Sequence, residues 1–387
     1  MTTPAYLDNA ATSFPKPPGV ARAVASFLDT SAGNPGRGGH RLAVAASRAV
    51  EGARDAVAQL LGADPERTLL GPGCTFWLNT LLQGLLEPGD RVVCSQLEHN
   101  AVMRPLRWLE AQRGVIVHSV AAAHPWGVPT PAELRAAVVL APTKLVVITH
   151  ASNVTGAVLP VAAITRAVAP VPVIVDAAQS AGSVPIDFAE LGVAALACSG
   201  HKGLLGPPGV GVLLLDDQLT PPPLLHGGTG SRSESELMPS LLPDALEAGT
   251  PNSPGYAGLE ASCAWLEERG VAAIQAHENQ LLAIAAQGLA GLPDVELIGF
   301  DPQQPHTGTL SFRVQGVDNG ELALWLDRRH GIQLRPGLHC APAAHRRLGS
   351  FPAGTLRAGF GPFNTVAHAQ GLVAAVASFP KRTQAQA

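Results

Sequence analysis

Val171-Pro-Val-Ile-Val-Asp-Ala-Ala-Gln179 is the stretch that decides the fold class, because a β-branched run typical of a buried strand ends there at a carboxylate. Similar runs occupy residues 91–94, 115–120, 144–149 and 209–215, and apolar helical stretches lie among them at 43–61, 75–86 and 131–138. Strands that alternate with helices predict βαβ units. We therefore expect an α/β fold with a mostly parallel sheet that helices cover on both faces.

In an open parallel sheet, ligands bind beyond the carboxyl ends of the strands. Asp176 comes directly after the run that ends at Val175, and residues 150–153 come directly after Thr149. A charge at the end of an apolar strand costs free energy unless it has a partner. This edge of the sheet is therefore where we expect the chemistry.

The second half of the chain predicts a smaller domain. Residues 220–254 are rich in Pro, Gly and Ser with little periodicity, which indicates a functional loop and a change of domain. Beyond it we expect a long helical stretch over 256–289, strands at 309–314 and 332–334, and helices at 319–330 and 366–378. These elements predict a large domain over 20–254 and a small α+β domain that combines 1–19 with 255–387.

The composition favours a large buried core and a buried subunit interface. Charged residues make up 14% of the 387 residues, below the roughly 25% of an average soluble domain, and 46% are hydrophobic. A net charge of −4 without a basic cluster offers no attraction for nucleic acid or an anionic membrane. We find neither a membrane-spanning apolar run nor a signal peptide, so we expect a cytoplasmic protein whose partners are small molecules.

One lysine stands out in a loop of small residues. Lys202 lies in Ala197-Cys-Ser-Gly-His-Lys-Gly-Leu-Leu-Gly-Pro-Pro-Gly-Val-Gly211, just before an apolar strand. A lysine that forms a Schiff base with a carbonyl cofactor must be partly desolvated, and small neighbours allow a planar ring to approach. Ser199 and His201 would be well placed to bind a phosphate. The alternative is a solvated lysine in an ordinary turn.

Asp176 strengthens the cofactor interpretation. A carboxylate beneath a pyridoxal ring keeps the ring nitrogen protonated, and Lys202 is near enough in the chain to hold the other end of the same ring. The alternatives for Asp176 are a helix N-cap or a metal ligand. A second carboxylate is lacking nearby in the sequence, so we predict no metal site. Neither GxGxxG after the first strand nor GxxxxGK[ST] occurs, which argues against a dehydrogenase or a P-loop enzyme.

The five cysteines are too far apart for a CxxC site. Cys340 lies in an irregular Gly- and Pro-containing segment beside His339 and near Arg335, and positive neighbours with exposure favour a nucleophilic thiolate. The alternative is a buried inert cysteine, which is how we interpret Cys94, Cys198 and Cys263 in their apolar runs.

Ten motifs in order resemble those of pyridoxal-phosphate enzymes of fold type I. They include Tyr6-Leu-Asp-Asn-Ala-Ala-Thr12, Asp176-Ala-Ala-Gln179, Ser199-Gly-His-Lys202 and Gly337-Leu-His-Cys340, with further matches at 34–40, 73–75, 98–102, 150–153, 247–252 and 357–365. The group they resemble is the class V aminotransferases, and within it the cysteine desulfurases with a short catalytic loop and the selenocysteine lyases. The resemblance implies a large domain with a seven-stranded type of sheet and a smaller C-terminal domain.

The resemblance also implies roles for individual residues. Lys202 would be the Schiff-base lysine, Asp176 would pair with the pyridine nitrogen, His99 would stack on the ring and Cys340 would attack the substrate sulfur. Gln179 would bond the ring hydroxyl. The phosphate would be held by Cys74 through its backbone N–H, with Thr75, Ser199, His201 and, from a second subunit, Thr250. The substrate carboxylate would bind Arg357 with help from Asn153, bordered by Arg37, His40 and Arg335.

These roles imply a pyridoxal-phosphate-dependent cysteine desulfurase that acts as a homodimer. It would convert L-cysteine into L-alanine and a persulfide on Cys340, and then pass the sulfur to an acceptor protein or thiol. The alternatives are a selenocysteine lyase, another C–S lyase or transaminase, and a catalytically silent scaffold paralogue. The chain departs from the group at Cys74, where a threonine is usual.

Overall fold

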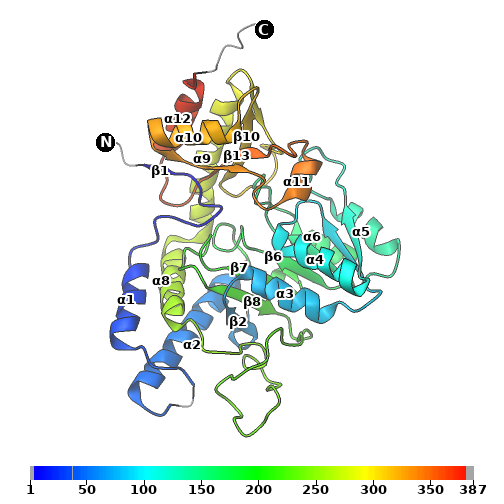
Figure 1. Cartoon of the computed structure of the whole chain (residues 1–387), viewed down its shortest axis with the longest axis vertical. Helices are drawn as coiled ribbons and strands as arrows, with labels where there is room; N and C mark the ends of the chain where they lie inside the picture. The colour runs from blue at the N-terminus through cyan, green and yellow to red at the C-terminus, as the bar shows by residue number, and fades with distance from the viewer. Residues whose placement is uncertain (1–3, 37, 381–387) are drawn as a thin grey trace.

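The computed structural model describes residues 4–36 and 38–380 and divides into a large lower part and a smaller upper part (Figure 1). The large part is built on a seven-stranded sheet in the order β2-β8-β7-β6-β5-β3-β4. Its strands are β2 (Thr68–Gly71), β3 (Arg91–Ser95), β4 (Ile116–Val120), β5 (Leu145–Thr149), β6 (Val173–Asp176), β7 (Ala195–Ser199) and β8 (Gly211–Leu215).

The sheet is mostly parallel, as the sequence predicts. All pairings among β4, β3, β5, β6 and β7 are parallel, whereas β8 runs antiparallel to both of its neighbours, β7 and β2. All five predicted runs form strands. The sequence analysis missed β2, whose Leu69 and Leu70 are not β-branched, and β7, which is rich in alanine and cysteine rather than β-branched residues.

Both faces of this sheet are covered by helices, because its central strands are apolar on both sides. Along β5, Val146 and Ile148 pack into one core, whereas Leu145 and Val147 pack into another. The first core is closed by α2 (Arg41–Leu61), α5 (Pro131–Val139), α6 (Val161–Val168), α7 (Phe188–Leu191) and α8 (Ser253–Arg269). The second is closed by α3 (Cys74–Leu85) and α4 (Asn100–Arg113).

The small part combines an antiparallel sheet with helices and with the start of the chain. Its sheet has the order β12-β13-β10-β9, with β9 (Val295–Leu297), β10 (Thr309–Val314), β12 (Arg335–Gly337) and β13 (Thr355–Gly359). Helices α9 (Val271–Ala290), α10 (Asn319–His330) and α12 (Val366–Ala377) contribute to one core beside it, and the short α11 (Pro342–Arg347) follows the Cys340 segment. The strand β1 (Ala5–Tyr6) pairs in parallel with β11 (Ile332–Gln333), so the first residues are joined to this part.

The helical stretch expected over 256–289 is present as two helices, α8 and α9, which Gly270 divides. Gly270 has φ 76°, a left-handed conformation that glycine adopts without strain and that ends an α-helix. Tyr256 and Leu266 of α8 belong to the first core of the large part, together with Ile274 at the start of α9. We therefore propose to place the junction between the domains near Gly270 rather than at residue 254.

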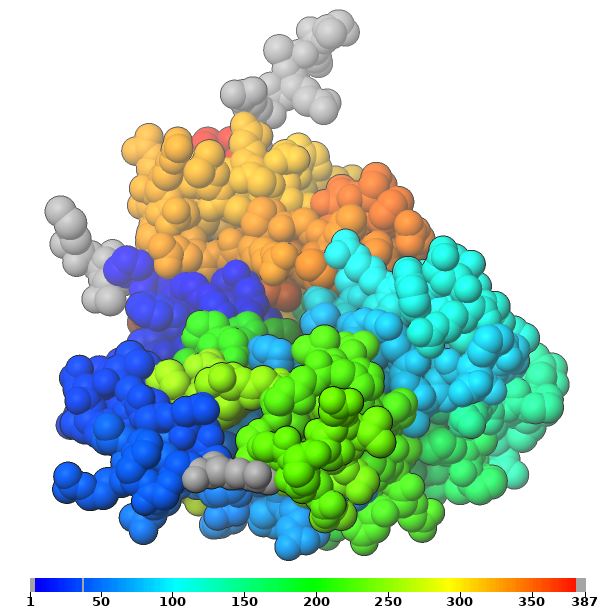
Figure 2. Space-filling model, turned by 60° about the horizontal axis from the view of Figure 1, so that its bottom comes forward, coloured from blue at the N-terminus to red at the C-terminus, as the bar shows by residue number. Residues whose placement is uncertain are grey.

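Residues 216–252, all of which the structure describes, form an irregular segment without helix or strand. Figure 2 shows much of this segment, in green, standing out on the same face as the blue N-terminal helices, among them α1 (Val20–Thr30). Within residues 4–36 and 38–380, no helix has the length and apolar character that crossing a membrane requires.

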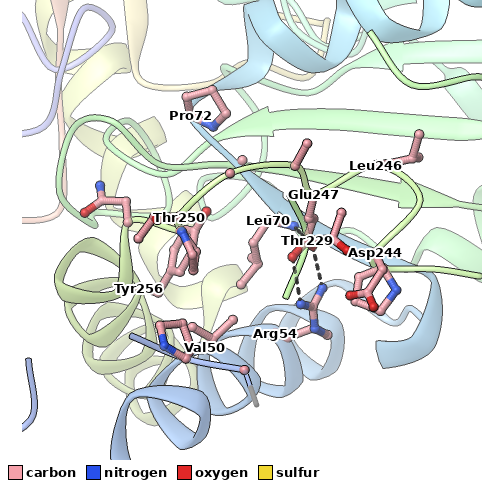
Figure 3. A pocket seen from close by; sticks show the side chains of 18 of the residues that line it. Val50, Arg54, Leu70, Pro72, Thr229, Asp244, Leu246, Glu247, Thr250 and Tyr256 are labelled. Atoms are coloured by element: carbon pink, nitrogen blue, oxygen red, sulfur yellow. Dashed lines mark hydrogen bonds and ion pairs between the residues drawn. The ribbon is translucent and has the colours of Figure 1, made fainter. Parts of the chain in front are cut away.

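A buried ion pair anchors the end of this segment (Figure 3). Arg54 of α2 donates to both carboxylate oxygens of Glu247, at 2.8 and 3.1 Å, and the backbone N–H of Leu70 donates to the same carboxylate at 2.7 Å. The Arg54 side chain is only 4% exposed. Beside the pair lies a cavity of ≈ 420 Å³ whose lining includes Thr250 and Tyr256.

Candidate active site

Asp176 marks the candidate site at the carboxyl end of β6. Its side chain is buried, and Oδ1 accepts a hydrogen bond from the backbone N–H of Ala178 at 2.9 Å. The thiol of Cys74 donates to the same oxygen at 3.4 Å. Asp176 is therefore a held, buried carboxylate, at the edge of the sheet that the strand pattern predicts.

Lys202 follows β7 and is half-buried. Burial lowers the pKa of its amine below the usual value, and the negative charge of Asp176 partly opposes this effect. A lysine with a lowered pKa has more of the unprotonated amine that Schiff-base formation requires.

The loop around Lys202 is held by the N-terminal segment. The carbonyl of His201 accepts hydrogen bonds from the backbone N–H of Ser13 at 3.0 Å and from the Lys16 ammonium at 2.9 Å. The His201 ring contacts the hydroxyl of Thr12 at 3.1 Å. Burial, with the charges of Lys202 and Lys16, lowers the pKa of His201 to about 4, so its ring is neutral at pH 7.

His99 caps the N-terminus of α4. Its Nδ1 accepts from the backbone N–H of Ala101 at 3.0 Å. Burial is the main reason that its pKa falls to about 4, with Lys202 and Arg357 adding to the effect and Asp176 opposing it. A neutral ring with one nitrogen tied to the backbone has a fixed orientation, which suits packing against a planar ligand.

The N-terminus of α3 offers an anion site. Cys74 and Thr75 are its first two residues, and the N-cap Gly73 has no side chain with which to cap the helix. The exposed N–H groups and the helix dipole together attract a phosphate. A Cβ on Gly211 would lie 2.3 Å from the Gly73 Cα, so this turn packs directly against β8.

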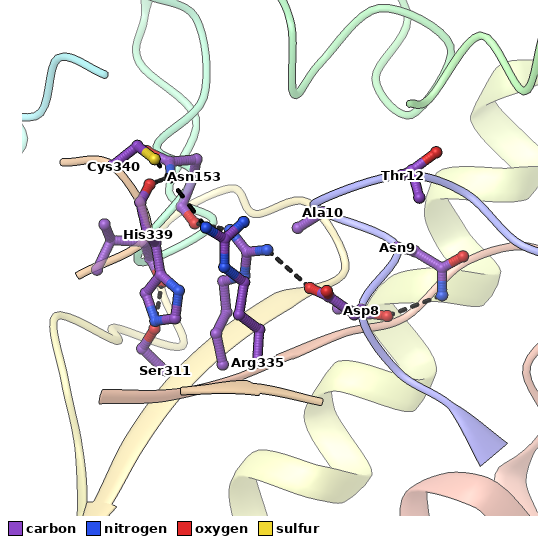
Figure 4. Close-up of polar contacts among 12 residues, drawn as sticks. Asp8, Asn9, Ala10, Thr12, Asn153, Ser311, Arg335, His339 and Cys340 are labelled. Carbon is purple, nitrogen blue, oxygen red and sulfur yellow. Dashed lines mark hydrogen bonds and ion pairs between the residues drawn. The ribbon is translucent and has the colours of Figure 1, made fainter. Parts of the chain in front are cut away.

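Arg357 forms the second polar centre, on β13 of the small part. Figure 4 shows the polar contacts around its two partners, Asp8 and Asn153. Its guanidinium donates to Asp8 Oδ1 and to the carbonyl oxygen of Asn153, both at 2.9 Å. Arg357 is only 1% exposed, and its Nε is buried without a hydrogen-bond partner, as is Oδ1 of Asn153. The spare N–H donors of this fork suit a planar carboxylate.

Cys340 is exposed, whereas Cys74, Cys94, Cys198 and Cys263 are buried. Its loop has two consecutive non-glycine residues in the left-handed region, His339 at φ 48° and Cys340 at φ 57°. The carbonyl of His339 accepts from the Asn153 side chain at 2.6 Å, and the carbonyl of Cys340 accepts from the backbone N–H of Asn100 at 2.7 Å. The guanidinium of Arg335 lies 4.0 Å from the thiol sulfur.

A groove of ≈ 590 Å³ brings this loop together with the helix ends. Thr75, His99 and Cys340 all line it, together with Arg104 and Trp108 of α4. The thiol therefore faces the same open space as the anion site and the neutral histidine. Buried cysteines do not share this geometry: burial raises the pKa of Cys94 and of Cys198 to about 12, so both stay protonated.

The remaining predicted residues lie in three places. Gln179 and Lys202 line the same small cavity, and the Gln179 amide donates to the Ala10 carbonyl at 2.9 Å. Ser199 is buried at the end of β7. His40 is exposed and caps α2, and Thr250 lies at the cavity beside Glu247, so within one chain neither is part of the Lys202 cluster. Arg37 lies outside the described residues.

Three residues of the site had no predicted role. Asp8 and Glu98 fall within motifs that the sequence analysis quotes, but a carboxylate that pairs with Arg357 at 2.9 Å is visible only after folding. Glu98 is fully buried beside His99 and accepts from the backbone N–H of Thr149 at 2.9 Å, and burial raises its pKa to about 8. No sequence pattern indicated a role for Lys16, because an isolated lysine after a proline resembles any loop residue.

The fold and this site define a known class. The sequence profile described as aminotransferase class-V matches residues 5–372, and the chain belongs to this family, which confirms the resemblance seen in the motifs. Its similar relatives bear a more specific name. The probable cysteine desulfurase 2 of Mycobacterium leprae is 36% identical, covering 96% of this chain and 90% of that protein. Cysteine desulfurase CsdA of Escherichia coli is 35% identical, covering 96% and 92%.

Solved structures agree with these relatives. The apo structure of the cysteine desulfurase from Thermococcus onnurineus NA1 matches with a TM-score of 0.89 at 30% identity, covering 97% of this chain and 94% of that chain. The S-sulfonic acid form of CsdA from Escherichia coli matches with a TM-score of 0.85 at 32% identity, covering 96% and 94%. The predicted α/β architecture of a fold type I enzyme is therefore confirmed.

Proposed function

We propose that this protein is a pyridoxal-phosphate-dependent cysteine desulfurase that forms L-alanine and a persulfide on Cys340. The observation that carries the proposal is the exposed thiol of Cys340, the one exposed cysteine among the described residues, in a groove that His99 and Thr75 of α3 also line. A transaminase would have no use for an exposed thiol at this position. The names of the similar relatives support the same activity.

The residues present fit the cofactor. An uncapped helix N-terminus at Cys74 and Thr75 suits a phosphate, and a buried carboxylate at Asp176 suits a protonated ring nitrogen. Lys202, with its lowered pKa, would hold the carbonyl carbon. Ser199 and His201 would complete the phosphate site, Gln179 would bond the ring hydroxyl, and His99 would pack against the ring.

When bound, pyridoxal phosphate supplies an electron sink that makes bonds near the Cα of an amino acid easier to break. The protein must then orient the substrate. Arg357 would bind its carboxylate as a two-point contact, with Asn153 beside it and Arg335 bordering the site. This contact would hold the substrate between the small domain and Lys202.

The sulfur step needs only the groups named. The thiolate of Cys340 attacks the sulfur of L-cysteine, so that an S–S bond forms while the Cβ–S bond breaks. The electron pair of the broken bond takes up a proton at Cβ, which gives L-alanine and a persulfide on Cys340. The amine of Lys202 would be a suitable group to move that proton. A thiol or an acceptor protein then removes the outer sulfur.

A homodimer and a cytoplasmic location complete the proposal. Within one chain Thr250 is exposed and is not part of the Lys202 cluster, so its role at a phosphate would need a second copy. The irregular segment that carries it exposes large apolar side chains, among them Leu237 at 82% and Leu241 at 65%. Such side chains are typical of a surface that a partner covers.

The test is an assay of the purified protein with pyridoxal phosphate. We expect a visible-range absorbance band, and equal amounts of alanine and sulfide from L-cysteine with a thiol reductant. A band without alanine would contradict cysteine as the substrate and would favour a selenocysteine lyase or transaminase. Absence of the band would favour the scaffold interpretation.

Replacing Arg357 with lysine tests the carboxylate site. Lysine keeps the positive charge beside Asp8 but loses the two-point fork, so we expect the KM for L-cysteine to rise by about tenfold with a smaller change in kcat. Arg346→Lys is the matched control, because Arg346 stacks on Phe351 with 4.4 Å between guanidinium and ring centre. Equal KM values for Arg357→Lys and the wild type would contradict this role.

A further inference from the structure

Asp176 has two donors on one oxygen, and one of them is unusual. Oδ1 accepts from the backbone N–H of Ala178 at 2.9 Å and from the Cys74 thiol at 3.4 Å. Cys74 is 4% exposed and Asp176 is 3% exposed. Because both contacts engage Oδ1, the other carboxylate oxygen remains available to a ligand.

The thiol is the donor in this contact. A carboxylate can only accept, and a thiol has one weak S–H donor. Burial and the negative charge of Asp176 raise the pKa of the Cys74 thiol well above the usual value, so the proton stays on sulfur at neutral pH. Cys74 is therefore not a second nucleophile, in contrast to Cys340.

The position of the thiol is fixed by the backbone. Cys74 is the first residue of α3, and the preceding Gly73 packs so tightly on Gly211 that an added Cβ there would lie 2.3 Å from the Gly73 Cα. Its backbone N–H faces the anion site while its side chain turns to the carboxylate. One residue thus contacts both regions where opposite ends of a pyridoxal phosphate would bind.

We propose that Cys74 is a positioning residue for Asp176, whose thiol holds one carboxylate oxygen so that the other faces the ring nitrogen of the cofactor. The inference rests on the proposed cofactor and deepens it. It also gives a role to the cysteine that stands where a threonine is usual.

The experiment compares Cys74→Ala and Cys74→Ser in the full-length protein. We expect the dissociation constant for pyridoxal phosphate to rise about threefold to tenfold in Cys74→Ala, the scale of one hydrogen bond to a charged group, and to recover in part in Cys74→Ser. The second readout is the ¹⁵N chemical shift of cofactor labelled at the ring nitrogen. The protonated fraction should fall in Cys74→Ala and rise again in Cys74→Ser.

Cys198→Ala is the matched control, since it removes another buried thiol whose titration also feels the charge of Asp176. Unchanged affinity and nitrogen shift in Cys74→Ala, or the same losses in Cys198→Ala, would overturn the inference. Failure of the wild type to bind pyridoxal phosphate would overturn the proposed function instead, so the two failures are distinguishable. Neither readout depends on desulfurase activity.

Discussion

Cys340→Ala is expected to bind pyridoxal phosphate with the same absorbance band as the wild type but to release sulfide from L-cysteine on the order of a thousandfold more slowly. Loss of the nucleophile costs on the order of a millionfold in kcat in a well-studied hydrolase, so a thousandfold is a lower bound. The substitution should leave the loop in place, because the contact that holds residue 340 is its backbone carbonyl, bonded to the N–H of Asn100 at 2.7 Å. The loss would therefore report chemistry rather than folding.

Backbone strain in this loop supports the same expectation. Two successive non-glycine residues with positive φ, His339 and Cys340, cost about 1–3 kcal/mol each unless the surroundings hold them. The Asn153 side chain, bonded to the His339 carbonyl at 2.6 Å, is one such support. Strain that is held in this way presents the thiol in one direction, toward the groove that His99 and Thr75 line.

Cys263→Ala is the control for this prediction, because Cys263 is a buried cysteine of α8. It should keep the wild-type rate. A thiol reagent applied to the native protein should modify Cys340 first and stop sulfide release in step with the modification. Sulfide release from Cys340→Ala at the wild-type rate would contradict the assignment of the nucleophile.

The second large effect concerns stability. Glu247→Ala should lower the free energy of unfolding by about 3–5 kcal/mol, because it leaves the Arg54 guanidinium, 4% exposed, without its bidentate partner. The backbone N–H of Leu70 would lose its acceptor as well. Urea denaturation with the cofactor at a fixed concentration measures the change.

The control for this measurement is the second ion pair of Arg54, whose acidic partner is exposed. Glu51 also pairs with Arg54, at 3.3 Å, but the Glu51 side chain is 60% exposed. Glu51→Ala should therefore cost less than about 1 kcal/mol. If Glu247→Ala and Glu51→Ala lowered the free energy of unfolding by similar amounts, burial would not explain how much the Arg54–Glu247 ion pair stabilises the fold.

How far the sequence predicts the fold depends on how local the signal is. β5 and β6 are apolar runs closed by polar residues, and the chain alone predicts them and the carboxylate that follows β6. β7 was missed because alanine and cysteine carry little strand preference, and its place in the sheet comes from pairing with β6 and β8. The division of the 256–289 stretch at Gly270 was missed because an isolated glycine is often tolerated within a helix.

In the site, too, the sequence predicts single residues from their local context but not the contacts between distant residues. Lys202, Asp176 and Cys340 stand out in the sequence because each carries chemistry in a local context of small or apolar residues. The pairing of Asp8 with Arg357 joins residues 349 positions apart, so no local pattern predicts it. The thiol contact of Cys74 with Asp176 is likewise a product of the assembled sheet.

The N-terminal segment has a mechanical consequence. Asp8 bonds Arg357, and Asn9 donates to the Gly359 carbonyl at 2.9 Å, while a few residues later Ser13 and Lys16 bond the His201 carbonyl beside Lys202. Residues 8–16 therefore connect Arg357, the proposed substrate-binding residue, to the loop of Lys202, the proposed cofactor-binding residue. A shift of Arg357 on substrate binding would therefore reach the lysine loop through the nine residues from Asp8 to Lys16.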